Sequence, residues 1–264
     1  MSIRSGLFSS GGLFFLAAVL LLSTTGGCGS GGSGPGRTIT VYAGAGTMTA
    51  LEQISPLFTE HSGYQVDFEF ASSGSLAKKI ASGAPCDLYV SASRDWIDYL
   101  LEKKLLDARS VKTVAGSELV CVVPENSPHG ALSPGELMRL ERIAVGDPVH
   151  VPVGKYAAQA LGYFGLWDSL SAAGKLVLAP TVSQALYLAR RGEVEAAVVY
   201  LGDARLADGV KVAFSFPSGS HDPVEFLGAI VVAGRAGPAA KKFLDFLACG
   251  PAVRVFNCCG FTVP

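Results

Sequence analysis

Residues 40–49, Thr-Val-Tyr-Ala-Gly-Ala-Gly-Thr-Met-Thr, decide the fold that we expect for this chain. The apolar pattern from Ile39 to Tyr42 predicts a buried strand that runs into this stretch. A helical pattern begins after the glycines, with Leu51, Ile54 and Phe58 on one face. The first N–H groups of a helix lack intrahelical partners, and the helix dipole adds partial positive charge there. A strand, a glycine-rich turn and a helix start therefore predict a site for an anion.

The same order of strand, short turn and helix start recurs along the chain. Turns rich in Gly, Ser, Thr or Val follow Tyr42, Phe70, Val145 and Leu178. This alternation of short strands and helices is typical of an α/β fold. The first three turns contain neither Lys nor Arg before Lys155, so neutral N–H and O–H groups would hold the anion without burying a cation. Four such helix starts indicate that they converge on one cleft.

The composition bounds the class of protein. The chain has 264 residues, of which 49% are hydrophobic and 16% are charged. This size suits one large domain or two lobes with their own cores. The net charge of −1 provides no basic surface for nucleic acid, so the composition favours a protein that binds a small partner.

Residues 1–28 have the pattern of a signal peptide. Arg4 is their only charged residue, and residues 13–22 form an apolar run of ten, too short to span a bilayer. Thr25-Gly26-Gly27-Cys28 resembles a lipoprotein cleavage box with Cys28 as the lipidated residue; ordinary cleavage near Gly27 is the alternative. Residues 29–36 predict a Gly/Ser tether. We expect an exported protein in the periplasm or on the outer face of the cytoplasmic membrane, anchored by its N-terminus.

The remaining cysteines do not have the spacing of a zinc site. They are Cys86, Cys121, Cys249, Cys258 and Cys259. Cys86 and Cys121 occur in apolar strand patterns, where a thiol acts as a small hydrophobic group. Cys249 could pair with Cys258 or Cys259 in an oxidising compartment, and the sequence leaves this open.

Two local patterns concern helices outside the turns. Pro56 falls inside the first helical pattern, where it predicts a kink because it removes one backbone hydrogen bond. Ser133 to Glu136 form a capping box with Pro134 at the first helical position, which predicts a helix that extends to Leu140.

Several blocks of the sequence resemble the periplasmic molybdate-binding proteins of ABC importers, the ModA family. The blocks are FASSGSLA (70–77), GAPCDLYVSA (83–92), GDPVHVPVG (146–154), VVY (198–200) and GFT (260–262). They occur in the order of the family and cover nearly all of residues 38–263. The middle blocks are the specific ones.

The resemblance implies a two-lobed α/β protein with the type II periplasmic-binding-protein fold. A hinge of two strands would join the lobes, with the ligand in the cleft between them. We expect the first lobe over residues 37–117 plus 222–264, and the second over residues 118–221. The resemblance also implies a monomer that delivers molybdate, and usually tungstate, to an ABC permease in the inner membrane.

The resemblance places the contacts to the oxygens of the ligand residue by residue. They are Ser73 through its hydroxyl and N–H, Val153 and Val182 through their N–H groups, and Tyr200 through its hydroxyl. The protein would contact molybdate only through the oxygens of the anion, with no direct metal ligand and no cofactor.

The first turn departs from the family pattern. Most members have a serine at the position of Gly46, and the side chain of that serine binds an oxygen of the ligand. Gly46 can offer only its N–H, so the hydroxyl of Thr47, one residue later, is the candidate replacement.

A lining made only of donors selects among anions. Molybdate, tungstate and sulfate are fully ionised at neutral pH, whereas protonated phosphate carries a hydrogen that needs an acceptor. Leaving that hydrogen unpaired costs roughly 1–3 kcal/mol. Sulfate or another tetrahedral oxyanion therefore remains an alternative ligand, separated from molybdate by size.

Two enzyme hypotheses fit the residues less well. Gly44-x-Gly46-x-x-Thr49 imitates a dinucleotide-binding turn, with Glu69 as the ribose acid, but the third glycine is absent. A hydrolase built on Ser72 or Ser73 lacks the G-x-S-x-G motif and a histidine in an obvious partner motif. The sequence predicts a binding protein and no enzyme.

Overall fold

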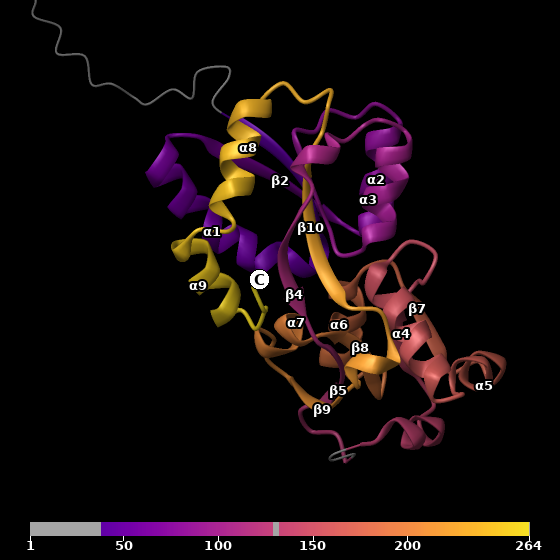
Figure 1. Cartoon of the computed structure of the whole chain (residues 1–264). Coiled ribbons are helices and arrows are strands. Elements are labelled where there is room, and N and C mark those ends of the chain that lie inside the picture. Colours follow the sequence, from indigo (N-terminus) through magenta and orange to yellow (C-terminus); the bar gives the residue numbers. More distant parts are fainter. Residues whose placement is uncertain (1–37, 129–131, 264) are drawn as a thin grey trace, which may run out of the picture. The chain divides into compact units, whose positions relative to one another are not determined.

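The computed structural model describes residues 38–128 and 132–263. The predicted signal peptide, Cys28 and the tether lie outside the described residues. The described chain forms two five-stranded sheets with helices on their faces (Figure 1). The first sheet has the order β2 (Gln65–Ala71), β1 (Thr38–Gly44), β3 (Leu88–Ser91), β10 (Val224–Ile230) and β4 (Lys112–Ser117). The second has the order β7 (Leu176–Ala179), β6 (Ile143–Gly146), β8 (Ala196–Tyr200), β5 (Leu119–Pro124) and β9 (Val210–Ser215).

The two sheets repeat one design. In the first, β1 pairs in parallel with β2 and β3, and β10 runs antiparallel to β3 and β4. In the second, β6 pairs in parallel with β7 and β8, and β5 runs antiparallel to β8 and β9. The carboxyl ends of parallel strands lie at one edge of a sheet, so each sheet brings its strand-to-helix turns together at that edge.

The helices cover both faces of each sheet. Those of the first lobe are α1 (Met48–Ser62), α2 (Ser73–Ala81), α3 (Arg94–Glu102), α8 (Gly237–Phe246) and α9 (Gly250–Cys258). Those of the second are α4 (Pro152–Tyr163), α5 (Trp167–Ala172), α6 (Val182–Arg190) and α7 (Leu201–Arg205). Short 3₁₀ helices are η1 (Ala45–Thr47), η2 (Ala108–Ser110), η3 (Pro134–Arg139) and η4 (Ser218–Ser220). In the first lobe, α2 and α3 lie on one face of the sheet and α1, α8 and α9 on the other (Figure 1).

Residues of the strands and of the helices form the core together. Ile39, Val41 and Ala43 of β1 are fully buried towards α1, while Tyr42 packs on the opposite face among residues of α2 and α3. The second sheet is apolar throughout its centre, because β5 and β8 are covered on both faces. This pattern explains why the sequence of β8 is continuously apolar.

The chain passes between the two sheets at two connections. The first joins β4 directly to β5 at Ser117 and Glu118, and the second runs from β9 to β10 through residues 216–223. The C-terminal segment returns to the first sheet, where the N–H of Gly116 donates to the carbonyl of Thr262 over 2.6 Å. The predicted lobe boundaries fall at these two connections and stay a prediction.

Three local expectations met different outcomes. Pro56 lies inside α1, which continues as one helix from Met48 to Ser62, so the missing N–H does not end it. The capping box of Ser133 and Glu136 is present, but it opens the 3₁₀ helix η3 in place of an α-helix. The cysteines of the described residues are all free, so the structure contains no pair of Cys249 with Cys258 or Cys259.

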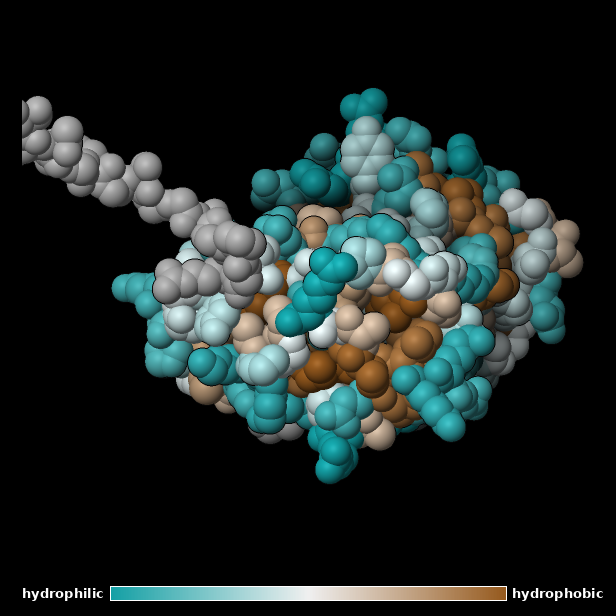
Figure 2. All heavy atoms as spheres, turned by 90° about the horizontal axis from the view of Figure 1, so that it is seen from above, coloured by the Kyte–Doolittle hydropathy of each residue, from teal (hydrophilic) through white to brown (hydrophobic). Residues whose placement is uncertain are grey.

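The surface mixes polar and apolar residues. In the face shown in Figure 2, hydrophobic residues form patches near the centre and towards the upper right, with hydrophilic residues around them. Within the described ranges no helix has both the length and the apolar character that a membrane span needs.

Candidate functional site

The strand-to-helix turns of both lobes line one small cavity. The first lobe contributes Gly44, Ala45, Gly46, Ala71, Ser72, Ser73 and Ala92, and the second contributes Val151, Pro152, Val153, Val182 and Tyr200. The cavity has a volume of about 10 Å³, close to the minimum that holds one water molecule. This volume leaves no room for a larger ligand.

The hydroxyl of the first turn is used in a hydrogen bond within the turn itself. The Oγ1 of Thr47 is buried and donates to the carbonyl oxygen of Gly44 over 2.8 Å. Thr47 does not line the cavity, so the structure does not bring this predicted site residue to the other five. A Cβ atom at Gly46 would lie 3.0 Å from the ring of Tyr200, which shows how closely the second lobe approaches the backbone here.

The second turn presents a serine hydroxyl as a donor. Ser72 caps α2, and its Oγ accepts a hydrogen bond from the N–H of Ser75. Ser73 is fully buried at the first position of α2, and its Oγ accepts from the N–H of Ala92 over 3.1 Å. A hydroxyl has one hydrogen and two lone pairs. The hydrogen of Ser73 therefore stays available to the cavity while the main chain orients its oxygen.

Two helices of the second lobe present main-chain donors. Val182 is the first residue of α6, after the cap Thr181, whose side chain accepts from the N–H of Gln184. Val153 is the second residue of α4 and follows Pro152. Because proline has no N–H, the N–H of Val153 is the first donor of that helix. Both N–H groups belong to the helix positions that lack intrahelical partners.

Tyr200 completes the lining from the end of β8. Its side chain is 2% exposed, and its hydroxyl has no hydrogen-bond partner in the structure. Burial raises the pKa of Tyr200 well above its ordinary value, since the charged phenolate would lose its hydration. Tyr200 is therefore a neutral phenol that can donate its hydrogen to an anion.

Direct contacts between the lobes surround the cavity. The N–H of Gly74 donates to the carbonyl of His150 over 3.1 Å, and the hydroxyl of Tyr156 donates to the carbonyl of Ala92 over 3.0 Å. A Cβ atom at Gly74 would lie 2.7 Å from the oxygen of His150, so this approach requires glycine.

An ion-pair cluster adds a charged contact at the same edge. Lys155 at the start of α4 pairs with the carboxylate of Asp95 in α3, and its Nζ lies 3.8 Å from a carboxylate oxygen of Asp222. The pair joins elements of different sheets, so it exists only when the lobes are close together.

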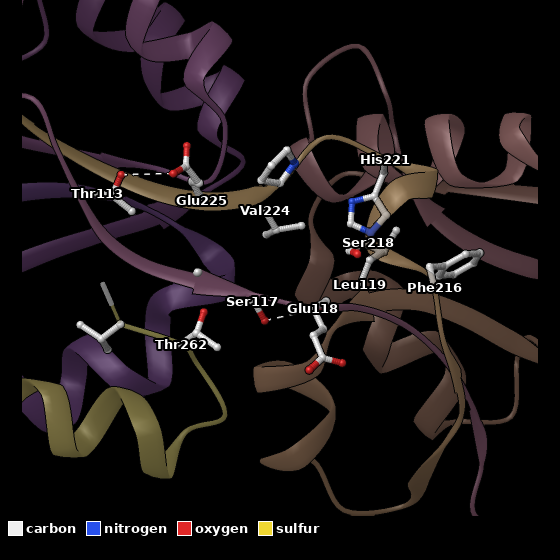
Figure 3. A pocket seen from close by; sticks show the side chains of 13 residues that line it. Thr113, Ser117, Glu118, Leu119, Phe216, Ser218, His221, Val224, Glu225 and Thr262 are labelled. Carbon is white, nitrogen blue, oxygen red and sulfur yellow. Dashed lines mark hydrogen bonds between the residues drawn. The ribbon is translucent and has the colours of Figure 1, made fainter.

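A larger groove lies at the two connections between the lobes. It has a volume of about 410 Å³ and is lined by residues of β4, Glu118, β5, the segment between β9 and β10, β10 and the C-terminal Thr262 and Val263 (Figure 3). Glu118 accepts a hydrogen bond from Ser215, and Glu225 accepts one from Thr113. These two carboxylates would repel an anion and therefore disfavour anion binding in this groove.

The lining of the small cavity does not favour metal or hydrolytic chemistry. Its serines bond to main-chain N–H groups and to Ser75, and it contains no histidine, cysteine or carboxylate. In the described part of the chain, no three His, Cys, Asp or Glu side chains are placed to hold a metal ion. What the cavity offers is a set of neutral hydrogen-bond donors.

Comparison with known proteins agrees with this geometry. Residues 39–262 match the family model described as bacterial extracellular solute-binding protein. The chain belongs to this family of solute-binding proteins. Together with the relatives and the solved structure described next, this match confirms the predicted resemblance and the predicted two-lobed α/β fold.

Individual members of the solute-binding family are similar over most of the chain. The molybdate-binding protein ModA of Escherichia coli (strain K12) is 40% identical over 231 residues, which cover 85% of this chain and 89% of that protein. ModA of Haemophilus influenzae is 36% identical over 230 residues, with 85% and 89% covered. The periplasmic molybdate-binding protein of Azotobacter vinelandii has the same fold, with a TM-score of 0.78 and 24% identity over 86% of this chain and 99% of that structure.

Proposed function

We propose that this solute-binding protein captures molybdate, and also tungstate, outside the cytoplasm and delivers it to an ABC permease. The observation that carries the proposal is the cavity between the lobes, whose polar groups are neutral donors from four separate turns. The two curated relatives described above are named for molybdate binding, which supports the choice of anion. A binding protein without catalytic activity and without a cofactor accounts for this lining.

The proposed contacts to the oxygens of the anion come from both lobes. Gly46 and Ser73 contribute N–H groups from the first lobe, and Ser73 adds its hydroxyl. Val153 and Val182 contribute N–H groups from the second lobe, and Tyr200 adds its hydroxyl. Thr47 holds the first turn through its bond to Gly44 and is left out of this set.

The lobes are proposed to open and close about the two connections. Residues 37–117 plus 222–264 would move against residues 118–221, and closure would bring the donors of both lobes around the anion. Cys28 is the proposed lipid attachment that keeps the monomer near its permease at the outer face of the cytoplasmic membrane.

Calorimetric titration tests the proposal directly. Purified protein is titrated with molybdate, tungstate, sulfate and phosphate, and its melting temperature is measured with each anion at millimolar concentration. Molybdate and tungstate are expected to bind most tightly and to raise the melting temperature, since a ligand at 100 times its Kd stabilises the native state by about 2.7 kcal/mol. Sulfate bound more tightly than molybdate would favour the alternative ligand, and no binding of any of the four would contradict the proposal.

The Ser73→Ala variant tests the assigned hydroxyl. Loss of a hydrogen bond to a charged ligand costs about 1.5–3 kcal/mol, so the affinity for molybdate is expected to fall about 10- to 100-fold. Ser82→Ala is the matched control, because this serine at the end of α2 donates to the carbonyl of Lys78 and does not line the cavity. If Ser73→Ala binds molybdate as tightly as Ser82→Ala and the unaltered protein do, Ser73 is not part of the site.

A further inference from the structure

One carboxyl group beside the cavity has no place in the contacts assigned so far. Asp203 lies in α7, three residues after Tyr200, and was not singled out from the sequence. Within residues 38–128 and 132–263, the buried side-chain polar atoms without a hydrogen-bond partner are the hydroxyl of Tyr200 and the Oδ2 of Asp203. Tyr200 lines the cavity, whereas Asp203 does not line it but lies next to Gly46, which does.

The carboxyl of Asp203 is close to the one turn that lacks a side chain. Its Oδ2 lies 3.4 Å from the position that a Cβ atom at Gly46 would occupy, and the ring of Tyr200 lies 3.0 Å from the same position. Asp203 and Tyr200 therefore both lie against the backbone of Gly46. Two residues of the other lobe thus take the space that adjoins Gly46.

The environment of Asp203 favours its neutral form. The residue as a whole is partly exposed, but its Oδ2 is inaccessible to water. Burial raises the pKa of the Asp203 carboxyl well above its usual range, and the N–H of Tyr200 opposes this only in part. A carboxylic acid carries an O–H that can donate a hydrogen bond, whereas a carboxylate can only accept and would repel an anion.

We propose that Asp203 is a further ligand-binding residue of the cavity, whose carboxylic acid O–H donates to an oxygen of the bound oxyanion beside Gly46. The inference deepens the proposed function and rests on it. It accounts for the unpartnered Oδ2, because a ligand oxygen supplies the acceptor that the protein does not. The neutral acid also adds one donor beside the cavity and no charge.

Two substitutions separate this role from a structural one. Asp203→Asn keeps an N–H donor and an acceptor for the N–H of Tyr200, and is expected to bind molybdate within about fivefold of the unaltered protein. Asp203→Leu keeps the volume but removes the donor, and is expected to bind about 10- to 100-fold more weakly. Asp168→Leu is the matched control, because Asp168 also lies in the first turn of a short helix of the second lobe and does not line the cavity.

The measurements are molybdate titrations of the four proteins and their melting temperatures without ligand. Absence of binding by the unaltered protein would contradict the proposed function itself. If the unaltered protein binds tightly and Asp203→Leu binds just as tightly, only the role of Asp203 is overturned. The same conclusion follows if Asp203→Asn folds but binds as weakly as Asp203→Leu. If Asp203→Leu fails to fold, a crystal structure of the unaltered protein with molybdate decides. Oδ2 within 3.2 Å of a ligand oxygen supports the inference, and a separation above 4 Å overturns it.

Discussion

At the scale of single residues, the direction of each hydroxyl decides which residues serve the ligand. The hydroxyls of Thr47 and Ser73 are both buried at helix starts of the first lobe. That of Thr47 gives its hydrogen to the carbonyl of Gly44, while that of Ser73 receives a hydrogen from Ala92 and keeps its own. Residue type and spacing predict a hydroxyl in each turn, but they do not predict whether its hydrogen is already used.

Thr47→Val separates these roles. The substitution keeps the shape of the side chain and removes the hydrogen bond to Gly44. The free energy of unfolding is expected to fall by about 0.5–1.5 kcal/mol, while the affinity for molybdate changes less than twofold. Urea unfolding and calorimetric titration measure the two quantities. A large loss of affinity at unchanged stability would return Thr47 to the set of ligand contacts.

At the scale of helices and strands, burial controls the chemistry of the cysteines. Cys86 precedes β3 and Cys121 lies in β5, and both thiols are buried. Burial raises the pKa of each thiol to about 12, because the thiolate would lose its hydration. Cys249 and Cys258, at the ends of α9, are exposed.

Alkylation at pH 8 tests this difference. The thiolate is the reactive form of cysteine, so Cys249 and Cys258 are expected to react in the folded protein while Cys86 and Cys121 do not. Peptide mapping by mass spectrometry measures the modified fraction of each residue, and unfolding in urea serves as the control in which all four react. Modification of Cys121 in the folded protein as fast as that of Cys258 would contradict the prediction.

The elements themselves were predicted in part. The four turns that the sequence indicates all lead into helix starts, at α1 through η1 and directly at α2, α4 and α6. The helix expected from Pro134 to Leu140 is a 3₁₀ helix, and the short α7 after Tyr200 was not expected. Short helices depend on packing more than on the propensity of their own residues, so α7 and Asp203 lack a sequence signal of their own.

At the scale of the whole described chain, the approach of the two lobes assembles the cavity. The turns of the first lobe and those of the second line it together, and the ion pair of Lys155 with Asp95 and Asp222 adds a charged contact between α3, α4 and the second connection. None of these three residues lines the cavity.

Lys155→Met tests the contribution of this contact. Partly exposed ion pairs contribute about 0.2–1 kcal/mol, so the affinity for molybdate is expected to fall about two- to fivefold, with little change in melting temperature without ligand. Lys241→Met is the control, since Lys241 pairs with Asp245 within α8. A higher affinity of Lys155→Met than of the unaltered protein would show that the pair does not favour the closed form.

The sequence by itself determined the local parts of the site. Neutral donors at helix starts are predicted by the alternation of strands and helices, by the glycine and serine turns, and by the absence of a basic residue from the first three turns. These features can be predicted because they depend on neighbours in the chain. Only the tertiary structure decided which donors meet. Tyr200 and Asp203 reach Gly46 from the other lobe, and the Thr47 hydroxyl turns inwards to Gly44. The physical reason is that packing between distant segments, rather than local spacing, sets where each buried polar group points and whether its hydrogen-bond donor or acceptor is already used.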